Sequence, residues 1–152
     1  MKIKMIILML AFFLMSVSAS NAQTTTVSAA DSAAIKQTAL DYIEGWYEGN
    51  AERMERSLHP ELAKRMVETN RNGKSRLNQM SAMTLVQYTR AGGGKSVPKD
   101  KQQKDVVILD VFENAASVKV VASDWVDYMQ MAKFDGRWVI VNVLWELKPK
   151  AK

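Results

Sequence analysis

The sequence predicts an α+β fold, in which helices from the first part of the chain pack on one face of an antiparallel sheet formed by the last part. Between residues 31 and 48, apolar residues recur at spacings of three and four, which is the period of a helix. After residue 104 the chain becomes rich in Val, Ile, Trp and Phe, in runs separated by turn residues, as is typical of strands. Helices followed by strands indicate the α+β class.

The first 22 of the 152 residues predict a secretory signal peptide. Two lysines precede an apolar run from Met5 to Met15, and small residues ending in Ala22 follow it. This run is shorter than the roughly 20 residues that a membrane-spanning helix needs. We therefore expect an exported protein, periplasmic or secreted, without a stable membrane anchor. The expected organisation is a flexible lead-in over 23–30, a single domain over 31–149 and a tail at 150–152.

The first helix of this domain is the clearest. Ser28 is its expected N-cap, and Asp31 lies near the positive end of the helix dipole. Gly49-Asn50 supplies the stop. One face of the helix carries the apolar residues Ile35, Ala39, Tyr42, Ile43 and Trp46.

The segment from Ala51 to Glu68 predicts two short helices with a bend at His59-Pro60. Pro60 disfavours helical geometry at His59, and proline suits the first position of a new helix. Residues 69–75 form a turn by composition. Leu77 and Met80 fit either a short strand or an irregular turn, and Ser81 can cap a helix that carries Leu85 and Tyr88 and ends at three glycines.

Four strands in meander order are expected in the last part of the chain. They fall within 105–114, within 116–134 as two strands divided near Asp124, and within 137–147. Asn114 and Asp135-Gly136 mark two of the turns between them. In the last strand both alternating registers are apolar, and Asn142 interrupts one of them.

Composition and charge argue against several classes of protein. The net charge is +5, and without the two lysines of the signal it is 19 − 16 = +3, from basic residues scattered among acidic ones. A nucleic-acid-binding protein would show a basic face with a recognisable module, so no nucleic-acid partner is expected. The chain has no cysteine and a single histidine, so neither a disulfide nor a zinc site is expected. We expect no metal and no cofactor.

The stretch "AGGGKS" does not form a phosphate-binding loop. The pattern needs a glycine where Thr89 stands, and it needs a strand before it and a helix after it. Here a predicted helix precedes the glycines and Val97-Pro98 follows them. The glycines are better explained as a helix stop followed by a loop.

Few side chains are candidates for chemistry. His59 is either an acid–base group at the mouth of a pocket or a helix-boundary residue with no such role. Asp110, Asp124 and Asp127 lie in or beside apolar strands. A carboxylate that is desolvated in a pocket can serve as a base, but strand-end carboxylates more often face water or pair with lysine and arginine.

Three segments together resemble the putative lumazine-binding family of the nuclear transport factor 2-like superfamily. They are "GWYEGNAERMERSLHPELAKR", "DVFENAASVKV" and "DWVDYMQMAKFDGRWVIVNVLWELKP". The resemblance covers roughly Asp31 to Pro149. It implies a cone-shaped fold, in which a curved antiparallel sheet wraps around helices and leaves a pocket at its open end, and it implies dimers formed through the sheet. Relatives with this cone include isomerases, dehydratases and non-catalytic binding domains, so the fold alone does not decide the function.

The resemblance also implies roles for particular residues. His59 matches the family's His-Pro, and Trp138, Ile140 and Asn142 match the inward register of the last long strand. The positions between them would then form an apolar dimer face of Val139, Val141 and Val143. The ligand-binding candidates are His59, Tyr88, Tyr128, Trp138 and Asn142.

We therefore expect an exported, non-catalytic homodimer that binds a small apolar or aromatic molecule, or that acts as an interaction module through its outer sheet face. The alternative is an isomerase- or dehydratase-type enzyme that uses His59 or a buried Asp as its general base, with Asp127 as the other candidate. An isomerase would also need an oxyanion donor, for which Tyr88 or Tyr128 could serve. No motif fixes these roles, so no catalytic residue is assigned.

Overall fold

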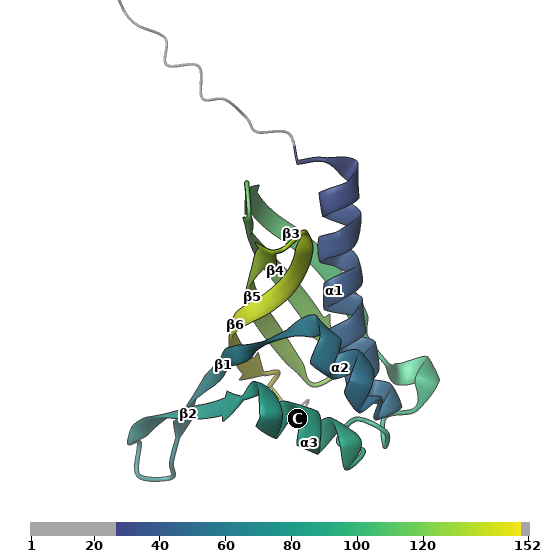
Figure 1. The fold of residues 1–152 in the computed structure, drawn as a ribbon. Coiled ribbons are helices and arrows are strands. Elements are labelled where there is room, and N and C mark those ends of the chain that lie inside the picture. The colour runs from purple at the N-terminus through teal and green to yellow at the C-terminus, as the bar shows by residue number, and fades with distance from the viewer. Residues whose placement is uncertain (1–26, 150–152) are drawn as a thin grey trace, which may run out of the picture.

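Six strands form one curved, mixed sheet in a computed structural model of the chain, which describes residues 27–149 (Figure 1). The order of the strands in the sheet is β2-β1-β6-β5-β4-β3. Their bounds are β1 Leu58–Thr69, β2 Ser75–Ser81, β3 Lys104–Phe112, β4 Ala115–Ala122, β5 Trp125–Phe134 and β6 Arg137–Leu147. The predicted signal peptide lies outside the described residues.

Three helices accompany the sheet: α1 Ala29–Glu48, α2 Ala51–Ser57 and α3 Ala82–Arg90. A short 3-10 helix, η1, covers Lys99–Lys101. Figure 1 shows α1 running along the inner side of the curved sheet, with α3 near its base and the β1–β2 hairpin projecting away from the body. Within residues 27–149, none of the helices has the length and apolar character required to cross a membrane.

The first helix has the predicted ends. The Ser28 side chain accepts a hydrogen bond from the Asp31 backbone N–H at 3.0 Å, and Gly49 ends the helix in the left-handed conformation at φ 66°. Asp31 also accepts hydrogen bonds from the Trp138 indole at 2.8 Å and from Lys133 Nζ at 2.7 Å. These contacts fix the start of α1 against β5 and β6.

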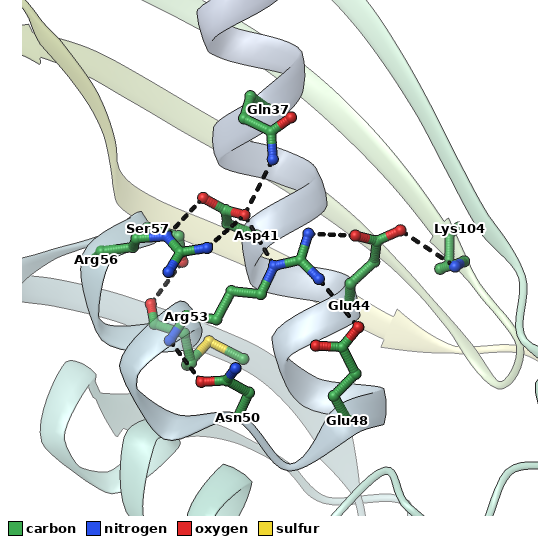
Figure 2. A network of polar contacts seen from close by, with 10 residues as sticks. Gln37, Asp41, Glu44, Glu48, Asn50, Arg53, Arg56, Ser57 and Lys104 are labelled. Atoms are coloured by element: carbon green, nitrogen blue, oxygen red, sulfur yellow. Dashed lines mark hydrogen bonds and ion pairs between the residues drawn. The ribbon is translucent and has the colours of Figure 1, made fainter.

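An ion-pair network joins α1 to α2 (Figure 2). Asp41 on α1 accepts hydrogen bonds from Arg53 Nε and Arg56 Nε, both at 2.9 Å. Arg53 also pairs with Glu44 and Glu48. Burial raises the pKa of Asp41, but the hydrogen bonds from the two arginines and from a glutamine outweigh that effect and lower it to about 2. The network thus holds the short helix α2 on the side of α1.

The predicted helix after Pro60 was wrong, because this segment is β1. Burial along it alternates, with Leu58, Leu62, Lys64 and Met66 buried, which is the period of a strand. β1 pairs antiparallel with β2 and parallel with β6. The sheet is therefore mixed rather than purely antiparallel, although the four-strand antiparallel meander from β3 to β6 is confirmed.

A bulge in β6 corrects the predicted register of the last strand. Gln130 pairs with Asn142 and Met131 pairs with Ile140, so Val141 is the extra residue between them. Ile140 and Val143 consequently face the same side, the core. The hairpin turn itself is the simple two-residue loop, since Asp135 and Gly136 both have positive φ, 49° and 80°.

The predicted dimer face of Val139, Val141 and Val143 is therefore not a continuous exposed face. Val143 belongs to the core, Val139 is only 1 % exposed, and Val141 is partly buried at the bulge. Leu144, which the simple alternation would turn toward the helices, is exposed instead. One inserted residue reverses the side of every residue after it.

Candidate functional site

A cavity of about 360 Å³ opens where the inner face of the sheet meets α1, α3 and the glycine-containing loop after α3. Its wall is largely aromatic and apolar and includes Trp46, Leu85, Tyr88, Val97, Trp125 and Trp145. Pockets for small molecules have this character, with an apolar wall and a few polar groups. We take this cavity as the candidate site.

Three buried polar side chains lie at the floor of this cavity: Tyr42 and Lys64 line it, and Asp127 is buried behind them. Lys64 Nζ donates to Tyr42 Oη at 2.8 Å and forms an ion pair with Asp127 Oδ1. Trp125 Nε1 donates to the other carboxylate oxygen, Asp127 Oδ2, at 2.6 Å. Lys64 is 4 % exposed, Tyr42 2 % and Asp127 0 %. The carboxylate therefore has a partner on each oxygen.

The secondary structure explains why these groups meet. On β1, Lys64 shares the inner face with Leu62 and Met66. On β5, Asp127 shares the inner face with two buried methionines. β6 lies between these two strands, and its residue opposite Asp127 is Trp145. The alternation of strand residues thus places one cation and one anion inside the curved sheet.

Burial controls the ionisation of the floor. It lowers the pKa of the Lys64 ammonium below its usual range, against the opposing charge of Asp127. Burial, together with the negative charge of Asp127, raises the pKa of Tyr42 well above its usual range. Tyr42 is therefore a neutral phenol at physiological pH, and the arrangement suits hydrogen bonding better than proton abstraction.

Trp145 differs from the other polar groups around the cavity. Its Nε1 is buried and has no hydrogen-bond partner among residues 27–149. Lys64 Nζ lies 4.6 Å from the centre of its ring, in a cation–π contact. An unpaired buried donor is uncommon in a folded protein and is a reason to look for a ligand.

The loop after α3 forms part of the cavity rim by packing closely on Trp46. A Cβ added at Gly93 would lie 2.3 Å from the Trp46 ring, and one at Gly94 would lie 2.4 Å from it. Only glycine allows the backbone to approach the indole so closely. Gly93 and Gly94 thus shape the rim, in addition to following the helix as predicted.

One of the predicted candidates lines this cavity, and a second is buried behind its floor. Tyr88, on α3, is 54 % exposed and lines the wall. Asp127 does not line the cavity and is buried behind its floor, paired with Lys64. Asp124, considered among the strand carboxylates, is exposed at the rim.

The other predicted ligand-binding residues lie elsewhere. His59 stacks on Phe134 with ring centres 4.8 Å apart, and its Nδ1 accepts from the Glu61 backbone N–H at 3.2 Å. Tyr128 is half-exposed on the outer face, and Trp138 is enclosed in the core with its indole bound to Asp31. The fifth residue, Asn142, was expected on the inner face, and that placement was wrong.

Asn142 lies on the outer face of the sheet because the bulge at Val141 precedes it. Its amide accepts from Arg65 Nη1 at 3.0 Å and donates to Gln130 Oε1 at 2.6 Å. Both hydrogen bonds are cross-strand contacts with neighbouring strands. The amide within the apolar strand is thus satisfied by side chains of the sheet.

Sequence reasoning missed Lys64, Tyr42 and Trp145 as site residues. The signal for Lys64 was present, since it alternates with Leu62 and Met66, but a helical interpretation of this segment hides a period of two. Tyr42 was expected only as a core residue of α1. Within residues 27–149, no group of three or more His, Asp and Glu side chains is arranged to hold a metal ion.

Comparison with known proteins assigns the fold. The sequence model of the family described as putative lumazine-binding matches residues 30–146. No curated protein matches the chain significantly.

Two NTF2-like proteins of unknown function have similar solved structures. The one from Methylobacillus flagellatus KT is 22% identical over 82% of this chain and 97% of its own, with a TM-score of 0.65. The one from Shewanella baltica OS155 is 17% identical over 82% of this chain and 99% of its own, with a TM-score of 0.63. A putative scytalone dehydratase from Novosphingobium aromaticivorans DSM 12444 is 12% identical over 79% of this chain and 85% of its own, with a TM-score of 0.54. At these identities the similarity shows the NTF2-like fold alone.

Proposed function

The chain belongs to the putative lumazine-binding family, and on that premise we propose that it is an exported homodimer that binds a small apolar or aromatic molecule without changing it chemically. The observation that carries this proposal is the cavity at the inner face of the sheet, whose aromatic wall surrounds a floor of paired polar groups. Export rests on the predicted signal peptide at residues 1–22.

The cavity supports binding by its size and its wall. A volume of about 360 Å³ lies within the range of small-molecule pockets. Trp46 and Trp125 meet edge to face with ring centres 6.1 Å apart, and Tyr88 presents a half-exposed ring beside them. Aromatic walls of this kind bury a large apolar area of a ligand. A flat apolar molecule would gain most from such a wall.

The floor argues against a general base. Each oxygen of Asp127 already accepts a hydrogen bond, one from Lys64 and one from Trp125. Abstracting a proton would require Asp127 to exchange the Lys64 ion pair for the substrate, and a buried charge that loses its partner is costly. His59, the other candidate base, lies away from the cavity against Phe134.

One observation keeps the enzymatic alternative open to test. A phenol, Tyr42, lines the cavity floor, and a buried carboxylate, Asp127, lies beside it, and these are the group types that an isomerase- or dehydratase-type enzyme needs. This alternative predicts turnover that is lost in Asp127→Asn. The binding proposal predicts no turnover by the wild type and none by Asp127→Asn.

Dimerisation is proposed through the outer face of the sheet. Five large apolar or aromatic side chains on this face are about half-exposed or more: Val107, Leu109, Phe112, Tyr128 and Leu144. Exposed large apolar side chains gathered on one face of a sheet commonly mark an interaction site. These residues replace the predicted face of Val139, Val141 and Val143, of which two are buried and one is partly buried.

Native mass spectrometry of the mature protein tests both parts of the proposal, since it reports a retained molecule and the oligomeric mass together. Ligand screening by thermal shift then identifies binders, because a molecule that binds only the folded state raises its apparent stability. Two half-exposed tyrosines provide a matched pair of variants. Tyr88→Ala removes part of the cavity wall, whereas Tyr128→Ala changes only the outer face.

We expect Tyr88→Ala to weaken ligand binding and to leave the mass unchanged. We expect Tyr128→Ala to bind ligand as the wild type does while weakening the dimer. The opposite pattern would contradict the assignment of the two surfaces. A broad screen of ligand-free protein that yields no thermal shift would contradict the binding proposal.

A further inference from the structure

We infer that the ligand of this cavity is electrically neutral and carries a hydrogen-bond acceptor that receives the indole N–H of Trp145. The inference rests on the proposed function, since it names the class of ligand for the same cavity. It follows from the charges and the hydrogen bonds of the floor.

The floor has no uncompensated charge for an ionic ligand. Lys64 and Asp127 are both buried and form an ion pair with one another, so their charges largely cancel at the cavity. An anion would meet a cation that is already paired, and it would pass the exposed carboxylate of Asp124 at the rim. An anion entering this aromatic site would lose its hydration without a matching partner.

A cationic ligand is disfavoured for a different reason. Both oxygens of Asp127 already have partners, so the floor offers it no vacant carboxylate. A cation could also bind to aromatic faces, but Lys64 Nζ already lies 4.6 Å from the centre of the Trp145 ring. A second positive charge in this cavity would be repelled by the ammonium.

The hydrogen bonds of the floor show which polar group the ligand should bring. Tyr42 Oη and the two oxygens of Asp127 each already accept a hydrogen bond. Trp145 Nε1 is a donor without an acceptor in the part of the chain that the structure describes. A carbonyl or another neutral acceptor would satisfy this N–H, whereas a hydrocarbon would leave the donor unpaired.

The test compares four probes that share a naphthalene ring and differ in one substituent. They are 2-acetylnaphthalene, its near-isostere 2-isopropenylnaphthalene, 2-naphthoate and 2-naphthyltrimethylammonium. Affinities are measured by titration against the purified mature protein. We expect the acetyl probe to bind about fivefold more tightly than the isopropenyl probe, as one net neutral hydrogen bond would give. Both charged probes should bind more weakly than the acetyl probe.

Two variants and one spectroscopic signal locate the hydrogen bond. Trp145→Phe removes the N–H and should abolish the preference for acetyl over isopropenyl. Trp46→Phe changes the wall at a ring that packs under the glycine loop, and it should weaken both probes alike. In the ¹⁵N-labelled wild type, only the Trp145 indole proton should move downfield with the acetyl probe and not with the isopropenyl probe. The four tryptophan signals are assigned with single Trp→Phe variants.

Each outcome has a distinct meaning. If 2-naphthoate or the ammonium probe binds most tightly, the cavity binds ligands but the inference about their charge is overturned. Equal affinity of the acetyl and isopropenyl probes, or an unmoved Trp145 signal, overturns the inference about the acceptor. If none of the four probes binds, the inference about the class of ligand is overturned, whereas the proposed function is refuted only when the broad thermal-shift screen also yields no binder.

Discussion

Replacing Lys64 with methionine should be the most destabilising single substitution at the cavity floor. The variant keeps a side chain of similar length but leaves Asp127, which is 0 % exposed, with a buried negative charge and only neutral partners, the Trp125 indole and the Tyr42 phenol. Breaking a buried pair by removing one partner costs about 3–5 kcal/mol. Domains of this kind are stable by only about 5–15 kcal/mol, so the variant should unfold at a much lower urea concentration.

The assay is urea unfolding followed by tryptophan fluorescence, since Trp125 and Trp145 lie next to the ion pair. Arg76→Met is the control, because it removes an ion pair to Glu68 in which Arg76 is 78 % exposed. An exposed pair contributes at most about 1 kcal/mol. The double variant Lys64→Met/Asp127→Leu removes both charges, so it should recover at least about 1 kcal/mol relative to Lys64→Met.

Two results would refute this reasoning. One is a cost for Lys64→Met as small as that for Arg76→Met, which would mean that the Asp127 charge is not effectively buried. The other is a double variant less stable than Lys64→Met alone. In that case the loss comes from packing around the two side chains rather than from the unpaired carboxylate.

Three further substitutions test other parts of the structure. Folding lowers the pKa of Asp41 from 3.8 to about 2, so the charged carboxylate stabilises the fold above pH 3.8, and this contribution is lost as the pH falls from 3.8 to about 2. The urea midpoint of the wild type should therefore decline over this pH range, and Asp41→Asn should flatten the decline. Leu144→Asp, on the outer sheet face, should give a monomer by light scattering, whereas Met83→Asp on α3, also at an exposed apolar residue, should leave the mass unchanged. Gly93→Ala should lower the free energy of unfolding by about 1–3 kcal/mol, measured with urea, because the added Cβ would overlap the Trp46 ring. A variant as stable as the wild type would show that the loop and the ring move apart at no cost.

The class of the fold and most of its elements were predictable from local patterns. The period of three and four in α1, its cap at Ser28 and its stop at Gly49 all lie within one segment of chain and are confirmed. The meander from β3 to β6 was equally predictable, since its strands are rich in apolar residues and turn-forming residues such as Asp135-Gly136 separate them. Such features depend on neighbours in sequence, so the sequence displays them directly.

β1 shows where local patterns fail. His59-Pro60 is compatible with the start of a helix, and Leu62, Met66 and Val67 fit a helical face as well as Leu62, Lys64 and Met66 fit a strand. The strand prevails because β1 gains hydrogen bonds from two partners, β2 and β6. One of these partners, β6, lies some 80 residues away in the chain (Leu58 against Ile140), and no local sequence pattern indicates this pairing.

By itself the sequence determined the α+β class, the helix that lines the inner side of the sheet, and the family to which the chain belongs, because these follow from periodicity, caps, turns and motif order. Only the tertiary structure decided the site. It brought Lys64 to Asp127 across an intervening strand, and it turned Asn142 outward through a single bulge. The physical reason is the same in both cases: the inner face of a curved sheet is composed by strand pairing, and pairing register depends on partners that are distant in sequence.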